Sequence, residues 1–199
     1  MTTKHALRCR CGKLTGEVVH PESGTRAVCY CKDCQAFARF LGHPDQVLDP
    51  QRGTEIIAIL PAHVSFTGGA EHLACMSLSP KGILRWYARC CNTPIGNTPR
   101  DFRVAHVGLI HACLSDPAHS LDESFGPVKM RVNTQGALGE VRASPLGTFA
   151  AIVKYLAALT GARLAGSYKR TPFFDAAGVP VRTPSVLSKA EHERLREAA

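Results

Sequence analysis

The stretch CYCKDCQAF, Cys29–Phe37, places three cysteines within six residues. The spacings C-x-C and C-x-x-C let sulfur atoms turn toward one point, and zinc in proteins is bound by about four such ligands. Cys29, Cys31 and Cys34 belong to one local loop, so they would leave a fourth position for water or a substrate sulfur. Thiolate is a soft ligand that favours zinc over magnesium or calcium. We predict a metal site here; the alternatives are a buried thiol cluster and a Cys31–Cys34 redox pair.

The chain contains nine cysteines, an odd number that rules out complete internal disulfide pairing. Cys9 and Cys11 form a second C-x-C group, and Cys90 and Cys91 are adjacent to each other far along the chain. A metal bound between such distant segments would tie a small sheet together, so we expect a structural zinc site. Two further cysteines lie in apolar, strand-like runs and are expected to be core residues: Cys75 and Cys113.

Length and composition indicate an ordinary globular protein. The chain has 199 residues, of which 45% are hydrophobic. The formal charge is +8, but no basic run exceeds two residues, so we expect solubility and charge compensation rather than a nucleic-acid partner. The start, MTTKHALRCRCG, lacks the apolar region of a secretory signal, and Lys154 and Arg163 interrupt the longest apolar stretch, 145–166. We expect a cytoplasmic protein without a membrane partner.

Short strand-like runs separated by turn signals dominate the first 113 residues. Residues 7–19 suggest a hairpin arm with a cysteine knuckle at its tip, and the helix that follows the CYCKDC knuckle is expected to stop at Gly42. Five more strand-like runs follow, and the segment NTPIGNTPRD, 92–101, is read as a turn. The pattern lacks the strand–helix alternation of a parallel sheet. It predicts a mainly β fold of twisted antiparallel sheets.

The sequence divides into a β domain, residues 1–125, and a C-terminal extension, residues 126–199. The segment SDPAHSLDESFGP, residues 115–127, has a loop-like composition. The extension is expected to contain a docking helix at about 145–163 and a polar terminal helix at about 188–198. It would cover or extend the sheet.

Each of the two predicted helices carries a start signal. Ser144 can cap the docking helix, with Pro145 at its first position. Ser188 and Glu191 form a capping box at the start of the polar helix. The docking helix has apolar residues at helical spacing, which are expected to pack on the domain: Phe149, Ile152, Val153, Leu156 and Leu159.

Three pieces of the chain resemble, in order, the glutathione-dependent formaldehyde-activating enzymes, which share a domain with centromere protein V. The pieces are CRCGKLTGEV (9–18), CYCKDCQAFARFLG (29–42) and GILRWYARCCNTPIG (82–96). The resemblance covers about residues 5–113. It implies a tent-like arrangement of antiparallel strands pinned by zinc knuckles. It also implies a structural zinc held by the first and third pieces, and a second, catalytic zinc at the middle piece that binds the glutathione sulfur.

The third piece departs from the family pattern C-x-x-C-G-T-P. When Cys91 and Asn92 are aligned with its C-G, Ala88 occupies the position of a ligand. Asn is a reasonable replacement for glycine because it tolerates a positive φ. Cys90 is the nearest substitute ligand, but adjacent side chains in a strand point to opposite faces. Either the chain turns sharply so that Cys90 and Cys91 share one metal, or the site has the three ligands Cys9, Cys11 and Cys91.

The resemblance implies a carbon–sulfur lyase that joins formaldehyde reversibly to glutathione or acts on a related thiol adduct. The alternative is a non-enzymatic binding module stabilised by zinc. Asp33 is the only carboxylate in the knuckle, and His106 and His111 are expected to be ordinary strand histidines on opposite faces. Phe173 and Phe174 are expected to pack, as part of an extended arm, on their own domain.

Overall fold

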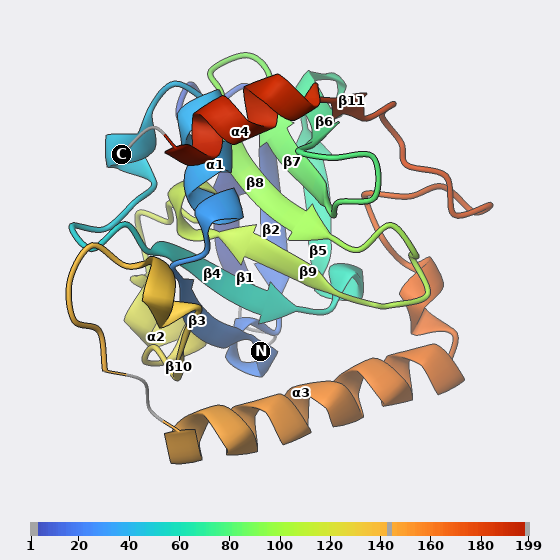
Figure 1. The fold of residues 1–199 in the computed structure, drawn as a ribbon. Coiled ribbons are helices and arrows are strands. Elements are labelled where there is room, and N and C mark those ends of the chain that lie inside the picture. Colours follow the sequence, from blue (N-terminus) through green and yellow to red (C-terminus); the bar gives the residue numbers. More distant parts are fainter. Residues whose placement is uncertain (1–3, 143–144, 198–199) are drawn as a thin grey trace.

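An eight-stranded sheet forms the centre of the protein in the computed structural model, which describes residues 4–142 and 145–197 (Figure 1). The strand order is β10-β3-β4-β9-β8-β7-β6-β11. Neighbouring strands are antiparallel except at the two edges, where β10 runs parallel to β3 and β11 runs parallel to β6. The strands are β3 (Thr25–Cys29), β4 (Thr54–Ile59), β6 (Leu73–Ser77), β7 (Leu84–Ala88), β8 (Thr93–Thr98), β9 (Val107–Ile110), β10 (Met130–Val132) and β11 (Ser185–Val186).

A three-stranded antiparallel sheet in the order β1-β2-β5 lies behind the large sheet in Figure 1. Its strands are β1 (Lys4–Arg8), β2 (Thr15–Val19) and β5 (Val64–Gly68). β1 and β2 form the predicted hairpin arm, with Cys9 and Cys11 in the turn between them. At Gly16 the register of β2 on β5 shifts, and an added Cβ would lie 2.3 Å from the Ser65 carbonyl oxygen. Only glycine fits this close approach of two backbones.

The main core lies between the two sheets. Trp86 and Phe173 are fully buried there, with ring centroids 5.2 Å apart, and Phe66 of β5 packs against Phe173 edge-on. Phe174 is also buried in this core. The expectation that residues 173 and 174 pack on their own domain is therefore confirmed. Trp86 donates a hydrogen bond from Nε1 to Thr98 Oγ1 at 2.9 Å, so its one polar atom is satisfied.

Two helices cover the other face of the large sheet: α1 (Lys32–Phe40) and α4 (Lys189–Glu197) (Figure 1). A second apolar cluster, which includes Phe37 and Leu41, lies beneath them. Asp33 in the first turn of α1 accepts from His192 Nε2 at 3.1 Å and pairs with Arg196 Nε at 3.3 Å, so α4 is fastened to α1. The predicted end of this first helix at Gly42 is confirmed, because α1 ends at Phe40 and Gly42 has a φ of 82°. The capping box Ser188–Glu191 is confirmed as well.

The helix α3 (Pro145–Leu164) matches the predicted span of 145–163, but it faces the other way. Phe149 and Leu156 are 70% and 55% exposed, whereas Ala151 and Ala162 are buried. The apolar residues expected to dock thus point largely to solvent, and small residues pack against the domain. The predicted cap at residue 144 lies outside the described residues. Over the described residues, none of the helices combines the length and the apolar character needed to cross a membrane.

Two segments predicted as turn or loop contain regular structure. Residues 93–98 of the predicted turn form β8, in which Pro94 pairs with Tyr87 where the β7–β8 register shifts. Proline is tolerated at such a bulge because the ladder hydrogen bond is already interrupted there. Within the predicted loop, α2 (Leu121–Phe125) begins at a capping box of Ser120 and Glu123.

The predicted extension is built into the β domain, because it supplies both edge strands, β10 and β11, of the large sheet. The protein is thus mainly β, with mixed sheets and a few helices that include a C-terminal one. The sheets place seven of the nine cysteines in two separate groups at the ends of strands.

Candidate metal centres

Four sulfur atoms form a cluster between the β1–β2 turn and the turn that joins β7 to β8: Cys9, Cys11, Cys90 and Cys91. All four lie within 4.8 Å of one another. The Sγ–Sγ distances are 3.6 Å for Cys9–Cys11, 3.7 Å for Cys9–Cys90, 3.4 Å for Cys11–Cys90 and 3.9 Å for Cys90–Cys91. A tetrahedron with zinc–sulfur bonds of about 2.3 Å has edges of about 3.8 Å. This four-sulfur cluster therefore fits one tetrahedral metal ion.

The chain turns sharply at the second half of this cluster, which decides between the two predicted ligand sets. Residues 89–92 form a turn, and the Cys91 N–H donates to the Ala88 carbonyl at 3.3 Å. Asn92 adopts φ 54°, the left-handed conformation expected for the residue aligned with glycine in the pattern C-x-x-C-G-T-P. Because the strand β7 has ended at Ala88, Cys90 and Cys91 are not constrained to opposite faces and both join the cluster.

Backbone and hydroxyl donors support the four sulfurs. The Leu14 N–H donates to Cys9 Sγ at 3.3 Å, and Thr93 Oγ1 lies 3.1 Å from Cys91 Sγ. Burial raises the pKa of the Cys9 thiol. Burial alone would also raise the pKa of Cys91, but hydrogen bonds from Thr93 and from Cys11 bring it down to about 6. The cluster thus favours a thiolate at Cys91 even before a metal binds.

The second group, here called the triad, consists of Cys29, Cys31 and Cys34. Cys29 ends β3, Cys31 is the N-cap of α1, and Cys34 lies in its first turn. The three sulfurs lie within 4.8 Å of one another, and the Sγ atoms of Cys31 and Cys34 are 3.1 Å apart. The Cys34 N–H donates to Cys31 Sγ at 3.3 Å. The N-terminus of a helix favours negative charge, so α1 stabilises thiolate at the triad.

Residues outside the C-x-C-x-x-C motif also surround the triad. Asn133 donates from Nδ2 to Cys29 Sγ at 3.3 Å. Gln35, fully buried, donates from Nε2 to the carbonyls of Tyr30 and Gly136 at 3.0 and 2.9 Å. A Cβ at Gly136 would lie 2.1 Å from the Tyr30 carbonyl oxygen, so only glycine allows the segment to approach this closely. The segment after β10 therefore closes one side of the triad.

A buried cation also acts on the triad. Arg85 of β7 is 3% exposed, and its guanidinium lies over the Phe37 ring, 5.2 Å from the centroid. It donates to Asn97 Oδ1 at 3.2 Å and has no carboxylate partner among the described residues. Its charge favours the thiolate form of Cys34. A sequence signal for Arg85 did exist, since it is a charged residue in the middle of the apolar run ILRWYAR.

The three thiols of the triad share their protons unequally. Hydrogen bonds from Cys31 and Cys34 hold the pKa of Cys29 far below its usual range. The Cys29 sulfur in turn raises the pKa values of Cys31 and Cys34. Without a metal the triad is therefore one thiolate with two protonated neighbours, and a metal that binds all three sulfurs must displace two protons.

The other cysteines and the single knuckle carboxylate stand apart from both clusters. All nine cysteines are free thiols. Cys75 and Cys113 are buried in the core, as expected, and burial raises the pKa of Cys75 to about 12. Asp33 is held by α4 through His192 and Arg196.

The two histidines expected within one strand lie just outside it, because β9 spans only Val107–Ile110. His106 Nδ1 is 2.5 Å from the hydroxyl of Tyr155 in α3. His111 begins a short 3-10 turn and lines a cavity. Neither histidine belongs to a cysteine cluster.

The chain was compared with known protein families. The model of a family described as "Family of unknown function (DUF6151)" matches residues 1–183. This span includes both cysteine clusters and α3, and it ends before α4. No curated protein matches the chain.

Proposed function

The chain belongs to the DUF6151 family, whose description assigns no activity, and we propose from its own residues that it is a zinc protein with one structural and one open, thiol-binding site. The structural zinc belongs to the four-sulfur cluster and the second zinc to the triad. The proposed reaction is that of a carbon–sulfur lyase acting on a glutathione adduct or a related thiol adduct. A reducing compartment such as the cytoplasm suits a protein with nine free thiols.

The observation that carries the proposal is the difference in ligand number between the two clusters. The four-sulfur cluster has a complete tetrahedral set, which is typical of a structural zinc. In the described part of the chain, the triad gathers only three metal-ligating side chains within 4.8 Å. Three protein ligands leave one position for an exogenous molecule, which is the layout of a reactive zinc.

The chemistry follows from the open position. Bound zinc would lower the pKa of an incoming thiol and hold it as thiolate. Around that position Asn133 and the α1 N-terminus fix the sulfurs of the triad, and Arg85 offsets their negative charge. Cys31 is partly exposed, whereas Cys29 and Cys34 are buried, so the approach for a ligand lies on the Cys31 side. A thiolate held beside a small aldehyde would add to its carbonyl carbon, and the oxygen would take a proton from water.

The test is a timed measurement of adduct formation from glutathione and formaldehyde by zinc-loaded protein. We expect a rate above the spontaneous reaction for the wild type and for Cys75→Ala, a matched control that removes a thiol outside both clusters. Cys31→Ser should return the rate to the spontaneous value while the four-sulfur cluster stays loaded. A wild-type rate equal to the spontaneous one, with metal analysis showing both sites filled, would exclude the lyase for this substrate.

A non-enzymatic binding module is the second candidate, and one contact favours it. Asp33, the only carboxylate in the knuckle, is engaged by His192 and Arg196 rather than free to move a proton. Titration calorimetry with glutathione separates the two candidates. Binding without rate enhancement supports the module, and binding should disappear in Cys31→Ser in either case.

A further inference from the structure

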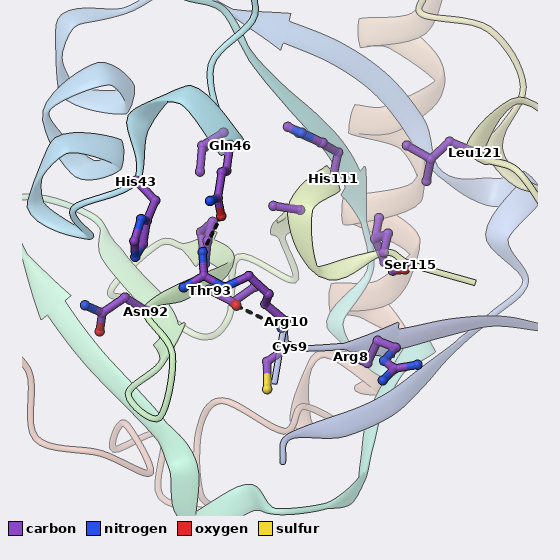
Figure 2. A pocket seen from close by; sticks show the side chains of 14 residues that line it. Arg8, Cys9, Arg10, His43, Gln46, Asn92, Thr93, His111, Ser115 and Leu121 are labelled. Atoms are coloured by element: carbon purple, nitrogen blue, oxygen red, sulfur yellow. Dashed lines mark hydrogen bonds between the residues drawn. The ribbon is translucent and has the colours of Figure 1, made fainter. Parts of the chain in front are cut away.

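A cavity of about 510 Å³ lies beside the four-sulfur cluster and apart from the triad, none of whose cysteines lines it. Segments far apart in sequence meet there: the end of β1, the loop after α1, the start of β8, the 3-10 turn after β9 and the start of α2. Figure 2 shows Arg10 joined to Gln46 by a hydrogen bond, with His43 to the left of Gln46, His111 to its right and Arg8 at the lower right. Cavities of this size hold small organic molecules.

The charged groups of the lining are all basic. Arg8, Arg10, His43 and His111 line the cavity, and its lining contains no carboxylate. Cys9 of the four-sulfur cluster is the one lining residue that can become an anion, and the two permanent cations and two histidines outnumber it. A volume with such an excess of basic groups attracts negatively charged ligands. Arginine also binds carboxylates with paired hydrogen bonds.

Two of these groups have unused hydrogen-bonding capacity. The Arg8 guanidinium has no hydrogen-bond or ion-pair partner among the described residues. His111 Nδ1 is buried and likewise lacks a partner within the part of the chain described. A buried polar atom without a partner destabilises the folded protein, and a hydrogen bond from a bound ligand or water removes that cost.

Arg10, by contrast, is already fixed in place. Its Nη1 donates to Gln46 Oε1, its Nη2 donates to the Cys91 carbonyl at 3.0 Å, and its backbone N–H donates to Thr93 Oγ1 at 3.0 Å. These bonds hold the guanidinium at the cavity wall and tie that wall to the four-sulfur cluster. The charge is thus positioned before any ligand arrives, which lowers the entropy cost of binding.

Part of the remaining wall is apolar, and this part narrows the class of ligand. Val47, Pro94, Leu114 and Leu121 line it. Inorganic phosphate would satisfy the arginines but leave this wall in contact with water, whereas an organic acid with a short hydrocarbon body would cover it. Arg8 lies at the end of β1 and Arg10 in the turn that follows it, so the cavity offers two separate cationic contacts, which suits an acid with two carboxylates.

We propose that this cavity is a binding site for a small organic dicarboxylate, with Arg8 and Arg10 as its charged contacts and Val47, Pro94, Leu114 and Leu121 as its apolar wall. The site is independent of thiol chemistry at the triad. Its test therefore does not depend on whether the proposed lyase activity is found.

The test is titration calorimetry of the metal-replete full chain with glutarate, with its neutral diamide glutaramide, and with inorganic phosphate. We expect glutarate to bind at least tenfold more tightly than either of the others. Arg8→Gln should weaken glutarate binding about ten- to hundredfold, as the loss of a charged hydrogen bond does. Arg103→Gln, which removes an exposed arginine that does not line the cavity, should leave the affinity unchanged.

A second variant tests the cavity without changing an arginine. Ser115 is exposed at the cavity wall, so Ser115→Glu places a negative charge there without disturbing the core, and glutarate binding should be lost. Absent glutarate binding, equal affinity for the diamide, or unchanged binding in Arg8→Gln or Ser115→Glu would each overturn the proposal. Tighter binding of phosphate would overturn the carboxylate assignment. Equal losses in Arg8→Gln and Arg103→Gln would show a general charge effect instead of a site.

Discussion

Once loaded with the proposed metal, the two cysteine clusters should contribute very differently to stability, because they close chain loops of different length. In the four-sulfur cluster, Cys11 and Cys90 are 79 positions apart. In the triad, Cys31 and Cys34 are three positions apart. If a metal cross-link restricts the unfolded chain as a disulfide does, these loops correspond to about 4.5 and about 1.6 kcal/mol.

Matched double variants isolate this difference. Cys90→Ser with Cys91→Ser separates the two halves of the four-sulfur cluster, and Cys31→Ser with Cys34→Ser opens the triad. Each removes two thiols, and we expect the first pair to lower the free energy of unfolding by about 3 kcal/mol more than the second. For a protein of this size that is a difference of about 6–12 °C in Tm.

The assay is thermal unfolding of metal-loaded proteins followed by circular dichroism, with metal content measured on each sample. Unfolding of each protein after chelation serves as the control, because the difference between variants should shrink once no metal is bound. Equal Tm values for the two loaded double variants, or a lower Tm for the triad variant, would refute the reasoning from loop length.

Three further predictions follow from particular contacts. Burial lowers the pKa of His106 to about 4, so its contribution to the free energy of unfolding should be complete above the ordinary histidine pKa and should fall by roughly 1.4 kcal/mol per pH unit as the pH drops from about 6.5 to 4. His106→Gln should flatten that part of a curve of Tm against pH. Parallel curves for the wild type and the variant would contradict the assignment. Leu156→Ser, on the exposed face of α3, should change the free energy of unfolding by less than about 0.5 kcal/mol, whereas Phe173→Ala in the core should lower it by about 3–5 kcal/mol. Denaturant titrations measure both values, and comparable losses for the two variants would mean that the outer face of α3 is covered. The zinc affinity of the triad should fall about 100-fold for each unit by which the pH decreases near neutrality, because the two thiols with raised pKa values, Cys31 and Cys34, must lose their protons to bind the metal. Competition with a chromogenic chelator measures this dependence of affinity on pH. An affinity that does not change with pH would show that the triad is already fully ionised.

The sequence was most informative where local chemistry decides the structure. The C-x-C and C-x-x-C spacings identified both clusters, and the expected positive φ at Asn92 is confirmed, since a tight turn restricts the residues that fit it. Whether Cys90 joins Cys91 in one cluster could not be decided from the sequence. It depends on where β7 stops, and element boundaries respond to tertiary packing.

The failures have a common cause in tertiary context. β8 begins at Thr93, in a segment rich in turn residues, because its pairing with β7 and β9 outweighs local propensity. The helix α3 is apolar on several sides, so spacing alone could not show that Ala151 and Ala162, rather than Phe149 and Leu156, face the domain. The cavity combines five distant segments and has no local sequence signature.

The contacts of His192 and Arg196 in α4 with Asp33 have a consequence for the order of events on the ribosome. A nascent chain emerges from its N-terminus at about 5–20 residues per second. The triad is complete at Cys34, whereas the four-sulfur cluster must wait for Cys91, roughly 3–11 s later at that rate. α4 is among the last segments made, and only then do His192 and Arg196 reach Asp33. The triad is therefore accessible to the proposed metal during synthesis, before α4 contacts the loop that carries it.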